Sequence, residues 1–153
     1  MPEVIPIGAD HAGVDLKARL VDELRTLGYE PLDLGTTGTE SVDYPDFAHA
    51  VAGRVERHDA RRGVLLCGTG LGMSYVANRY PHVRAAVTWS PEVAQLARSH
   101  NDANVLVLPA RFVTDDDAVK ILRTWLDTPF EGGRHERRVV KIENAGAAES
   151  KEK

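Results

Sequence analysis

The sequence predicts an α/β fold in which a parallel sheet is covered by helices on both faces. Short apolar runs alternate with longer amphipathic segments along the chain, and strands that alternate with helices form parallel sheets. One run, 63–67 (GVLLC), carries no polar or charged side chain except its terminal thiol, as expected of a strand buried on both faces. The length of 153 residues suits one domain with a sizeable core. We therefore expect one domain over 1–145, and a disordered tail over 146–153, where the residues are small or charged.

In the first half of the chain, the pattern changes from strand to helix and back twice. The predicted elements are, in order, strand 4–8, helix 12–28, strand 29–35, helix 46–58 and strand 63–67. The first helix is predicted from leucines that recur at three- and four-residue spacing, namely Leu16, Leu20, Leu24 and Leu27. Gly28 is a suitable stop for this helix, and Pro45 stands just before the second one.

The second half continues the alternation. The predicted elements are helix 71–80, strand 83–89, helix 91–100, strand 103–109, helix 114–128 and a last helix from about Gly133 into the 140s. Pro91 after Ser90 is a good helix start, because serine caps a helix and proline fits its first turn. Thr114 is the expected cap of the next helix, whose first turn carries acidic residues that suit the helix dipole.

Composition excludes several classes of protein. The net charge of −4 offers no basic surface for nucleic acid. No apolar run approaches the roughly 20 residues of a membrane span, and the N-terminus lacks the pattern of a signal peptide. The single cysteine, Cys67, cannot form an internal disulfide, and no set of His, Cys, Asp and Glu has metal-ligand spacing. We therefore expect a cytoplasmic protein without a metal, a membrane or a nucleic-acid partner.

The stretch 66–74 (LCGTGLGMS) places glycines between the third predicted strand and a predicted helix. Glycines allow a tight turn, and the free N–H groups of a helix N-terminus attract anions. The stretch is not a P-loop, because G-x-x-x-x-G-K-[ST] is absent. It also lacks the dinucleotide fingerprint, since its spacing is G-x-G-x-G and no acidic residue ends the next strand at Thr88 and Trp89.

Two interpretations are open for Cys67. Cysteine is among the most buried residue types, so the thiol at the end of an apolar strand can be purely structural. A thiol that faces a helix N-terminus and a glycine turn is instead favoured as thiolate. The neighbouring N–H groups would stabilise an oxyanion, and a base beside an oxyanion hole can remove a proton from a carbon next to a carbonyl.

Further polar residues stand at the ends of predicted elements. Asp10 and His11 follow the first strand and Arg111 follows the fifth, so they are expected at the same sheet edge as Cys67. Asp10 can alternatively cap a helix. The remaining polar candidates are Asp43 with Tyr44, His100 with Asn101, and Arg134 with Arg138.

These remaining candidates also allow two interpretations each. Arg134 and Arg138 lie four residues apart on one predicted helical face, which suits a phosphate but also an ordinary solvated face. His100 and Asn101 can form a helix C-cap, and the segment Asp43-Tyr44-Pro45 can be a simple turn.

Five segments taken together resemble the type B ribose-5-phosphate isomerases. They are GADHAG, DLGTTGTESVDYPDFA, LLCGTGLGMSYVANR, ARSHNDANVLVL and EGGRHERRV, in the order of that family, and the resemblance covers about residues 3–142. The wider family also contains allose-6-phosphate and galactose-6-phosphate isomerases. The resemblance implies a Rossmann-like, three-layer α/β/α sandwich with a five-stranded parallel sheet. It also implies a homodimer or dimer of dimers with shared active sites, which interconverts ribose 5-phosphate and ribulose 5-phosphate without a metal or cofactor.

The resemblance also implies roles for individual residues. Cys67 matches the base that moves the proton through an enediolate, because Met73, Ser74 and Tyr75 offer no carboxylate of the kind found in another branch of the family. Catalytic roles are implied for Cys67, for the hydroxyl of Thr69 and for His100 in ring opening. Sugar contacts are implied for Asp10, Asp43, Tyr44 and Asn101. Anion contacts are implied for the turn Gly68, Gly70, Leu71, Gly72, Met73 and Ser74. A phosphate clamp, partly from the partner subunit, is implied for His11, Arg111, Arg134 and Arg138.

Two other functions remain open on the sequence. A hexose-6-phosphate isomerase of the allose-6-phosphate type would need a longer pocket. A non-catalytic sugar-phosphate binding protein would keep His11 and the arginines but would not need Cys67 and Thr69.

Overall fold

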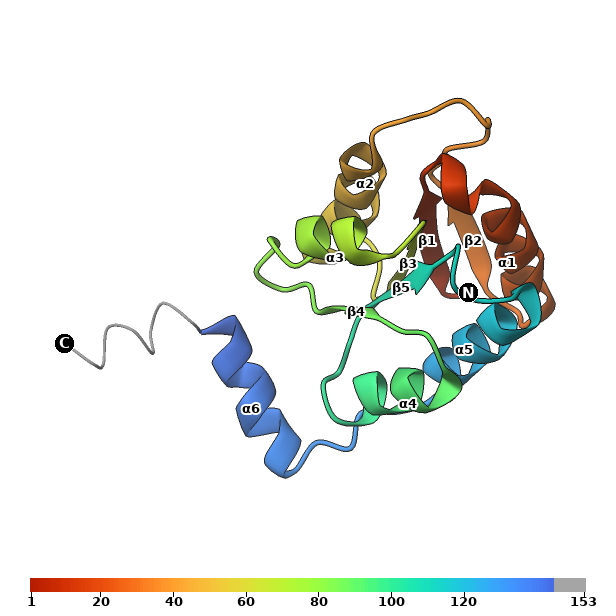
Figure 1. The fold of residues 1–153 in the computed structure, drawn as a ribbon. Coiled ribbons are helices and arrows are strands. Elements are labelled where there is room, and N and C mark those ends of the chain that lie inside the picture. Colours follow the sequence, from red (N-terminus) through yellow and green to blue (C-terminus); the bar gives the residue numbers. More distant parts are fainter. Residues whose placement is uncertain (145–153) are drawn as a thin grey trace.

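A computed structural model describes residues 1–144 and confirms the predicted α/β fold (Figure 1). Five parallel strands form one sheet in the order β2-β1-β3-β5-β4. The strands are β1 (Val4–Ala9), β2 (Glu30–Asp33), β3 (Gly63–Cys67), β4 (Ala85–Val87) and β5 (Val105–Pro109). The helices are the short 3₁₀ helix η1 (His11–Gly13), α1 (Val14–Thr26), α2 (Tyr44–Glu56), α3 (Leu71–Ala77), α4 (Pro91–Ser99), α5 (Asp115–Asp127) and α6 (Arg134–Glu143). The predicted tail over 146–153 lies outside the described residues.

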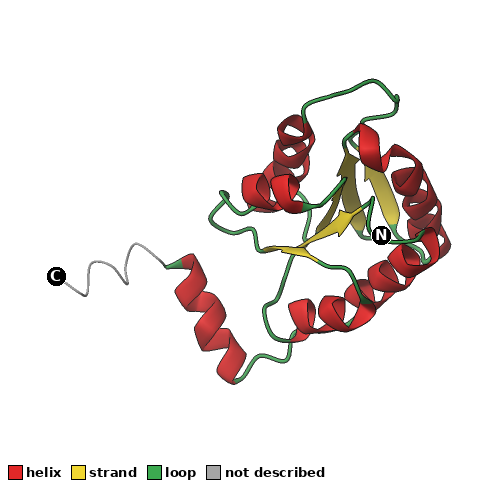
Figure 2. Cartoon of the chain, in the orientation of Figure 1, coloured by secondary structure: helices red, strands yellow, loops and turns green. Residues whose placement is uncertain are grey.

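The helices cover both faces of the sheet, which gives the expected three layers (Figure 2). On one face, buried side chains of α1, α4 and α5 pack on the sheet, with Trp125 fully buried among them. On the other face, α2 and α3 pack on the sheet around Met73. Every residue of β3 and β5 is buried, because these central strands have helices on both sides.

Local chemistry explains where several helices begin. The Ser90 hydroxyl accepts a hydrogen bond from the Val93 amide at 3.2 Å, and the Thr114 hydroxyl accepts one from the Asp117 amide at 3.1 Å. Both are N-caps, as expected. Helix α2 begins two residues before the predicted start, with Pro45 inside its first turn, where a missing N–H is tolerated.

Helix α3 and strand β4 are both shorter than predicted. The Asn78 side chain accepts a hydrogen bond from the Ala85 amide at 2.8 Å and donates one to the Ala85 carbonyl at 3.0 Å. This side chain therefore ends α3 and fixes the start of β4. The apolar pattern continues on both sides of this junction, so it could not reveal the boundary.

The last helix, α6, projects from the body of the domain (Figure 1). The Glu131 amide donates to the Ser99 carbonyl at 3.1 Å just before the helix, and Arg84 pairs with Glu143 at its end. Val140 and Ile142 on α6 are exposed. None of the helices within 1–144 has the length and apolar character needed to cross a membrane.

Candidate active site

The carboxyl ends of the central strands bring three polar segments together. The Asp10 amide donates to the Leu66 carbonyl at 3.2 Å, which joins the end of β1 to β3. The Arg111 amide donates to the Gly68 carbonyl at 3.0 Å, which joins the end of β5 to the glycine turn. The order of the sheet reverses direction between β1 and β3, and open parallel sheets bind ligands at such a point.

The glycine turn after β3 has the geometry of an anion site. Gly70 has a φ of 78° and is the N-cap of α3. A Cβ atom there would lie 3.2 Å from Val87 and 3.3 Å from Val107, so only glycine fits without strain. The N–H groups of Gly72 and Met73 lie in the first turn of α3, where they have no partner within the helix.

The backbone amides of two other residues of the predicted turn already donate hydrogen bonds within the chain. The Ser74 amide donates to the Gly70 carbonyl at 3.1 Å, and the Ser74 hydroxyl donates to the Leu71 carbonyl at 2.7 Å. The Leu71 amide donates to the Thr69 hydroxyl at 3.2 Å. The turn therefore has fewer free N–H donors than the whole stretch from Gly70 to Ser74 would offer.

Cys67 is buried at the end of β3, with 5% of its surface exposed. Its side chain belongs to the apolar cluster between the sheet and helices α2 and α3, together with Met73. The thiol is thus on the face of the sheet where α3 begins.

The loop between β2 and α2 closes one side of this group. The Val42 amide donates to Nδ1 of His11 at 3.2 Å, so in a neutral imidazole the proton is on Nε2. This leaves Nε2 free to donate to a ligand. Tyr44, at the start of α2, lies against the glycine turn, since a Cβ atom on Gly72 would be 2.5 Å from its ring. Asp43 occupies the N-cap position of α2, and no side-chain capping hydrogen bond forms there.

Asp10 and Arg111 have different surroundings. The Asp10 carboxylate accepts a hydrogen bond from the Ala12 amide at 3.0 Å, so it caps η1 in addition to facing the sheet edge. Arg111 is exposed, and its guanidinium lies beside the turn, 3.2 Å from the position of a Cβ atom on Gly68. Arg111 therefore supplies hydrogen-bond donors beside the glycine turn.

The remaining predicted residues form a second group at the other end of the strands, near their amino ends. His100 is the C-cap of α4 and Asn101 follows it, before the amino end of β5. Arg134 and Arg138 are exposed on α6, near this helix end. Within the single chain, this group and Cys67 lie at opposite ends of the strands, so one chain does not unite all the predicted residues.

His135, which stacks on His100, was not among the predicted site residues. The ring centroids are 4.2 Å apart and the planes differ by 13°. Burial, followed by interaction with His100 and with the Arg134 guanidinium, lowers the pKa of His135, and Glu131 opposes this only in part. The spacing of Glu131 and His135, four residues apart, was a weak signal for a contact.

An ion pair between buried Lys17 and partly exposed Asp33 was also not predicted from the sequence. The Lys17 ammonium lies 2.6 Å and 2.7 Å from the two oxygens of Asp33, and the Gly35 amide donates to the same carboxylate at 2.9 Å. The pair holds the first residues of the loop that leads to Tyr44. The available signal was a lysine at a position on the buried stripe of α1, three residues before Leu20.

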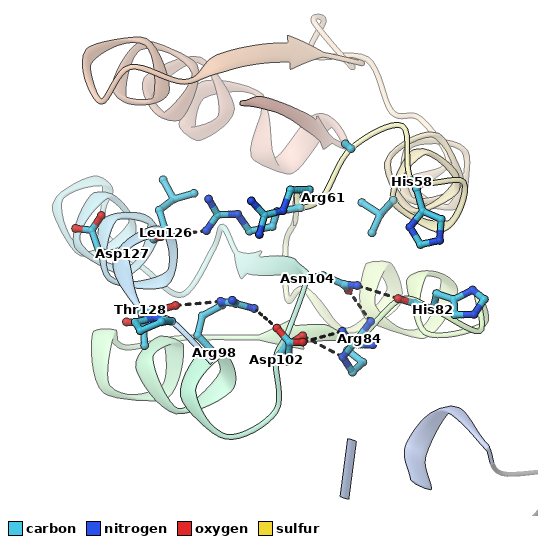
Figure 3. A pocket seen from close by; sticks show the side chains of 14 residues that line it. His58, Arg61, His82, Arg84, Arg98, Asp102, Asn104, Leu126, Asp127 and Thr128 are labelled. Carbon is cyan, nitrogen blue, oxygen red and sulfur yellow. Dashed lines mark hydrogen bonds and ion pairs between the residues drawn. The ribbon is translucent and has the colours of Figure 1, made fainter. Parts of the chain in front are cut away.

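A cavity of about 460 Å³ lies near the amino ends of the strands (Figure 3). Arg62 pairs with Glu3 at 2.8 Å and donates to the Leu126 carbonyl at 3.0 Å. Arg98 pairs with Asp102 at 2.8 Å. These arginines bind other parts of the chain, so the cavity is explained by structural ion pairs and is separate from the glycine turn.

Comparisons with known proteins identify the family to which the chain belongs. A family model described as "Ribose/Galactose Isomerase" matches residues 5–142. A probable ribose-5-phosphate isomerase B of Mycoplasma genitalium is 45% identical over 138 residues, which cover 89% of this chain and 91% of the relative. The ribose-5-phosphate isomerase B of Escherichia coli is 44% identical, with 90% and 93% of the two chains covered.

Solved structures are similar over nearly the whole chain. A ribose 5-phosphate isomerase from Thermotoga maritima is 51% identical with a TM-score of 0.89, and 92% of this chain and 97% of that chain are covered. Ribose-5-phosphate isomerase B from Mycoplasma genitalium with bound ribulose-5-phosphate is 42% identical with a TM-score of 0.92, and 96% and 98% are covered.

Proposed function

Because the chain belongs to the ribose/galactose isomerase family, we propose that it is an aldose–ketose isomerase that interconverts D-ribose 5-phosphate and D-ribulose 5-phosphate. The observation that carries the proposal is the position of Cys67 at the carboxyl end of β3, on the face of the sheet where α3 begins, at the end of the strands that also holds His11 and Arg111. A base, an oxyanion site and an anion clamp are the parts that this reaction requires.

In the proposed reaction, the phosphate positions the sugar and His100 opens the ring by proton transfer. The Cys67 thiolate then takes the proton from C2 of the open-chain aldose. The electron pair of the C–H bond forms the C1–C2 double bond of an enediolate, whose negative charge accepts hydrogen bonds from the amides of Gly72 and Met73. The thiol returns the proton to C1, and a proton moves from O2 to O1, which leaves the carbonyl at C2.

We also propose that two chains share each active site in a homodimer or a dimer of dimers. One chain would supply Cys67 and the glycine turn, and His100 and Arg134 would come from the partner subunit. The support is their separation by the sheet within one chain, together with the projection of α6. Apolar side chains are exposed on α6 and around the start of α3, namely Val140, Ile142, Leu71 and Tyr75. A cytoplasmic location is part of the same proposal.

Isotope exchange tests the chemistry. Ribose 5-phosphate incubated with the protein in deuterated water should gain deuterium at carbon, because the thiol exchanges its proton with solvent. A Cys67→Ala variant should neither exchange nor turn over, and full activity in this variant would exclude Cys67 as the base. The same assay with allose 6-phosphate separates a pentose from a hexose phosphate isomerase, and absence of turnover with both sugars would refute both of these activities.

Mixing two inactive variants tests the shared site. When Cys67→Ala and His100→Asn chains are unfolded and refolded together, half of the dimers are mixed and each mixed dimer has one intact site. About a quarter of the wild-type activity should therefore return, if the chains pair at random. A mixture of Cys67→Ala and Thr69→Ala is the matched control, because both changes fall on the same half of the site and no intact site forms. No recovery in the first mixture would refute sharing.

A further inference from the structure

Three side chains that can bind a metal converge beside α6. His100, Glu131 and His135 each offer a ligand atom, and these atoms all lie within 4.8 Å of one another. They come from three parts of the fold: the end of α4, the connection from α5 to α6, and the first turn of α6. Of these three side chains, the proposed reaction uses only His100. The reaction therefore does not explain why an acid and a second imidazole lie close to His100.

The fold brings these three residues close together. The Glu131 amide is hydrogen bonded to the Ser99 carbonyl at 3.1 Å, next to His100 in the chain. His135 has only 6% of its surface exposed, and its Nε2 lies 3.4 Å from a carboxylate oxygen of Glu131. The two imidazoles are therefore held together by stacking and burial, and the exposed Glu131 side chain reaches them from a backbone position that is itself hydrogen bonded.

The ligand set has the chemistry of a zinc site. Two imidazoles and one carboxylate, with the fourth position left to water, form a known tetrahedral arrangement for Zn²⁺. Bonds of about 2.0–2.1 Å place tetrahedral ligands about 3.3 Å apart, so the cluster has to contract on binding. The stacked rings of His100 and His135 are nearly parallel, so one ring has to turn about its side-chain bonds to aim its nitrogen at the ion. Exposed Glu131 is free to follow.

We propose that His100, Glu131 and His135 bind one Zn²⁺ ion per chain, and that the bound ion withdraws His100 from the sugar. The second part rests on the proposed function, because it requires His100 to open the ring. Arg134 and Arg138 lie on the same helix as His135, one residue before it and three residues after it, and their positive charge weakens the binding of a cation there. The site is therefore suited to reversible inhibition by zinc and not to permanent structural binding.

Zinc binding is measured first, without reference to activity. The metal-free, assembled protein is titrated with ZnCl2 by calorimetry, and we expect one ion per chain. Glu131→Gln should weaken binding at least about tenfold, since even the loss of an outer partner of a ligand costs that much. Glu136→Gln is the matched control, because this exposed acid of α6 lies outside the cluster, and it should bind zinc as the wild type does.

Two further variants exclude other zinc sites. His82 lies 2.8 Å from Glu56 and is another place where an imidazole meets a carboxylate, so His82→Asn should leave binding unchanged. Cys67→Ala should leave it unchanged as well. Equal binding in the wild type and Glu131→Gln, or loss of binding in His82→Asn or Cys67→Ala, would overturn the proposed site.

Inhibition is measured second. Zinc should lower the isomerase rate of the wild type, a chelator should restore it, and Glu131→Gln should need at least about tenfold more zinc for the same loss. Zinc binding in a protein that shows no isomerase activity would support the site and refute the proposed function. Stoichiometric binding with no change in the isomerase rate would refute the withdrawal of His100.

Discussion

Gly72→Ala is expected to damage the site while leaving the fold nearly intact. Gly72 is the second residue of α3, and a Cβ atom there would lie 2.5 Å from two ring carbons of Tyr44 and 2.9 Å from its hydroxyl oxygen. Atoms that are not bonded cannot approach so closely, so the ring has to move. Tyr44 stands at the start of α2 with 38% of its surface exposed, and its ring can therefore turn outward into solvent.

The magnitudes follow from these contacts. Alanine is favoured over glycine within a helix by up to about 1 kcal/mol, and the lost packing of a half-exposed ring costs about as much. The free energy of unfolding should therefore stay within about 1 kcal/mol of the wild type. A shift of about 1 Å in a positioning residue can cost about 100-fold in rate, so kcat/KM should fall by about 10–100-fold if Tyr44 contacts the sugar.

Gly70→Ala, two residues earlier, is the matched comparison, and its main effect should be a loss of stability. Its φ of 78° costs an alanine about 1–2 kcal/mol, and contacts of 3.2 and 3.3 Å with buried valines add about 1 kcal/mol. The total of about 2–3 kcal/mol corresponds to a fall in Tm of about 4–12 °C.

Urea unfolding and steady-state kinetics on both variants test this reasoning. In a Tyr44→Ala background, the steric conflict is absent, so Gly72→Ala should no longer reduce stability or activity. If Gly72→Ala loses more than about 3 kcal/mol, the ring of Tyr44 cannot move as described. If this variant keeps full kcat/KM, Tyr44 has no part in binding the sugar.

Two buried charges away from the site give further predictions. Burial raises the pKa of Glu23, but hydrogen bonds from Arg123 and Arg19 outweigh this effect and hold the pKa below its ordinary value. The stabilisation from Glu23 is therefore present above its unfolded-state pKa and is lost as pH falls through the lower folded-state pKa. Since both arginines are about half exposed, Glu23→Gln should lower the free energy of unfolding by about 1 kcal/mol at pH 7, and the gap measured by urea unfolding should close in acid. Lys17→Met should lower the free energy of unfolding by about 1–2 kcal/mol, which is less than for a fully buried pair, because 39% of the Asp33 side chain is exposed. Adding Asp33→Asn to the same chain should recover part of this loss. A further loss of stability would refute the pairing.

The sequence predicted an element best where its pattern allowed only one interpretation. The run 63–67 became β3 without change, because it is apolar throughout and its neighbours are not. The end of α3 was missed, since it depends on a side-chain contact of Asn78 with Ala85. Such contacts depend on how the chain folds back, and residue spacing does not carry that information.

The same distinction applies to the candidate site. The group around Cys67 could be predicted, because parallel strands end at one edge and the polar residues follow the strands directly. The stacking of His100 on His135 could not, because it depends on how the chain folds back from α4 to α6 across a separation of 35 residues. The convergence of Glu131 on the same rings has the same origin.

The order of the strands limits which residues one sugar can contact within a single chain. Helix α4 begins at the carboxyl end of β4 and runs back along the sheet, so its last residue and His100 lie at the opposite edge from Cys67. A strand of five residues such as β3 is about 16 Å long, and a five-carbon sugar phosphate cannot reach across it. Simultaneous contact with Cys67 and His100 therefore requires two chains. The zinc ligands all lie in the half of the site that α4 and α6 would supply, so zinc would act on one chain and stop turnover at the Cys67 of its partner.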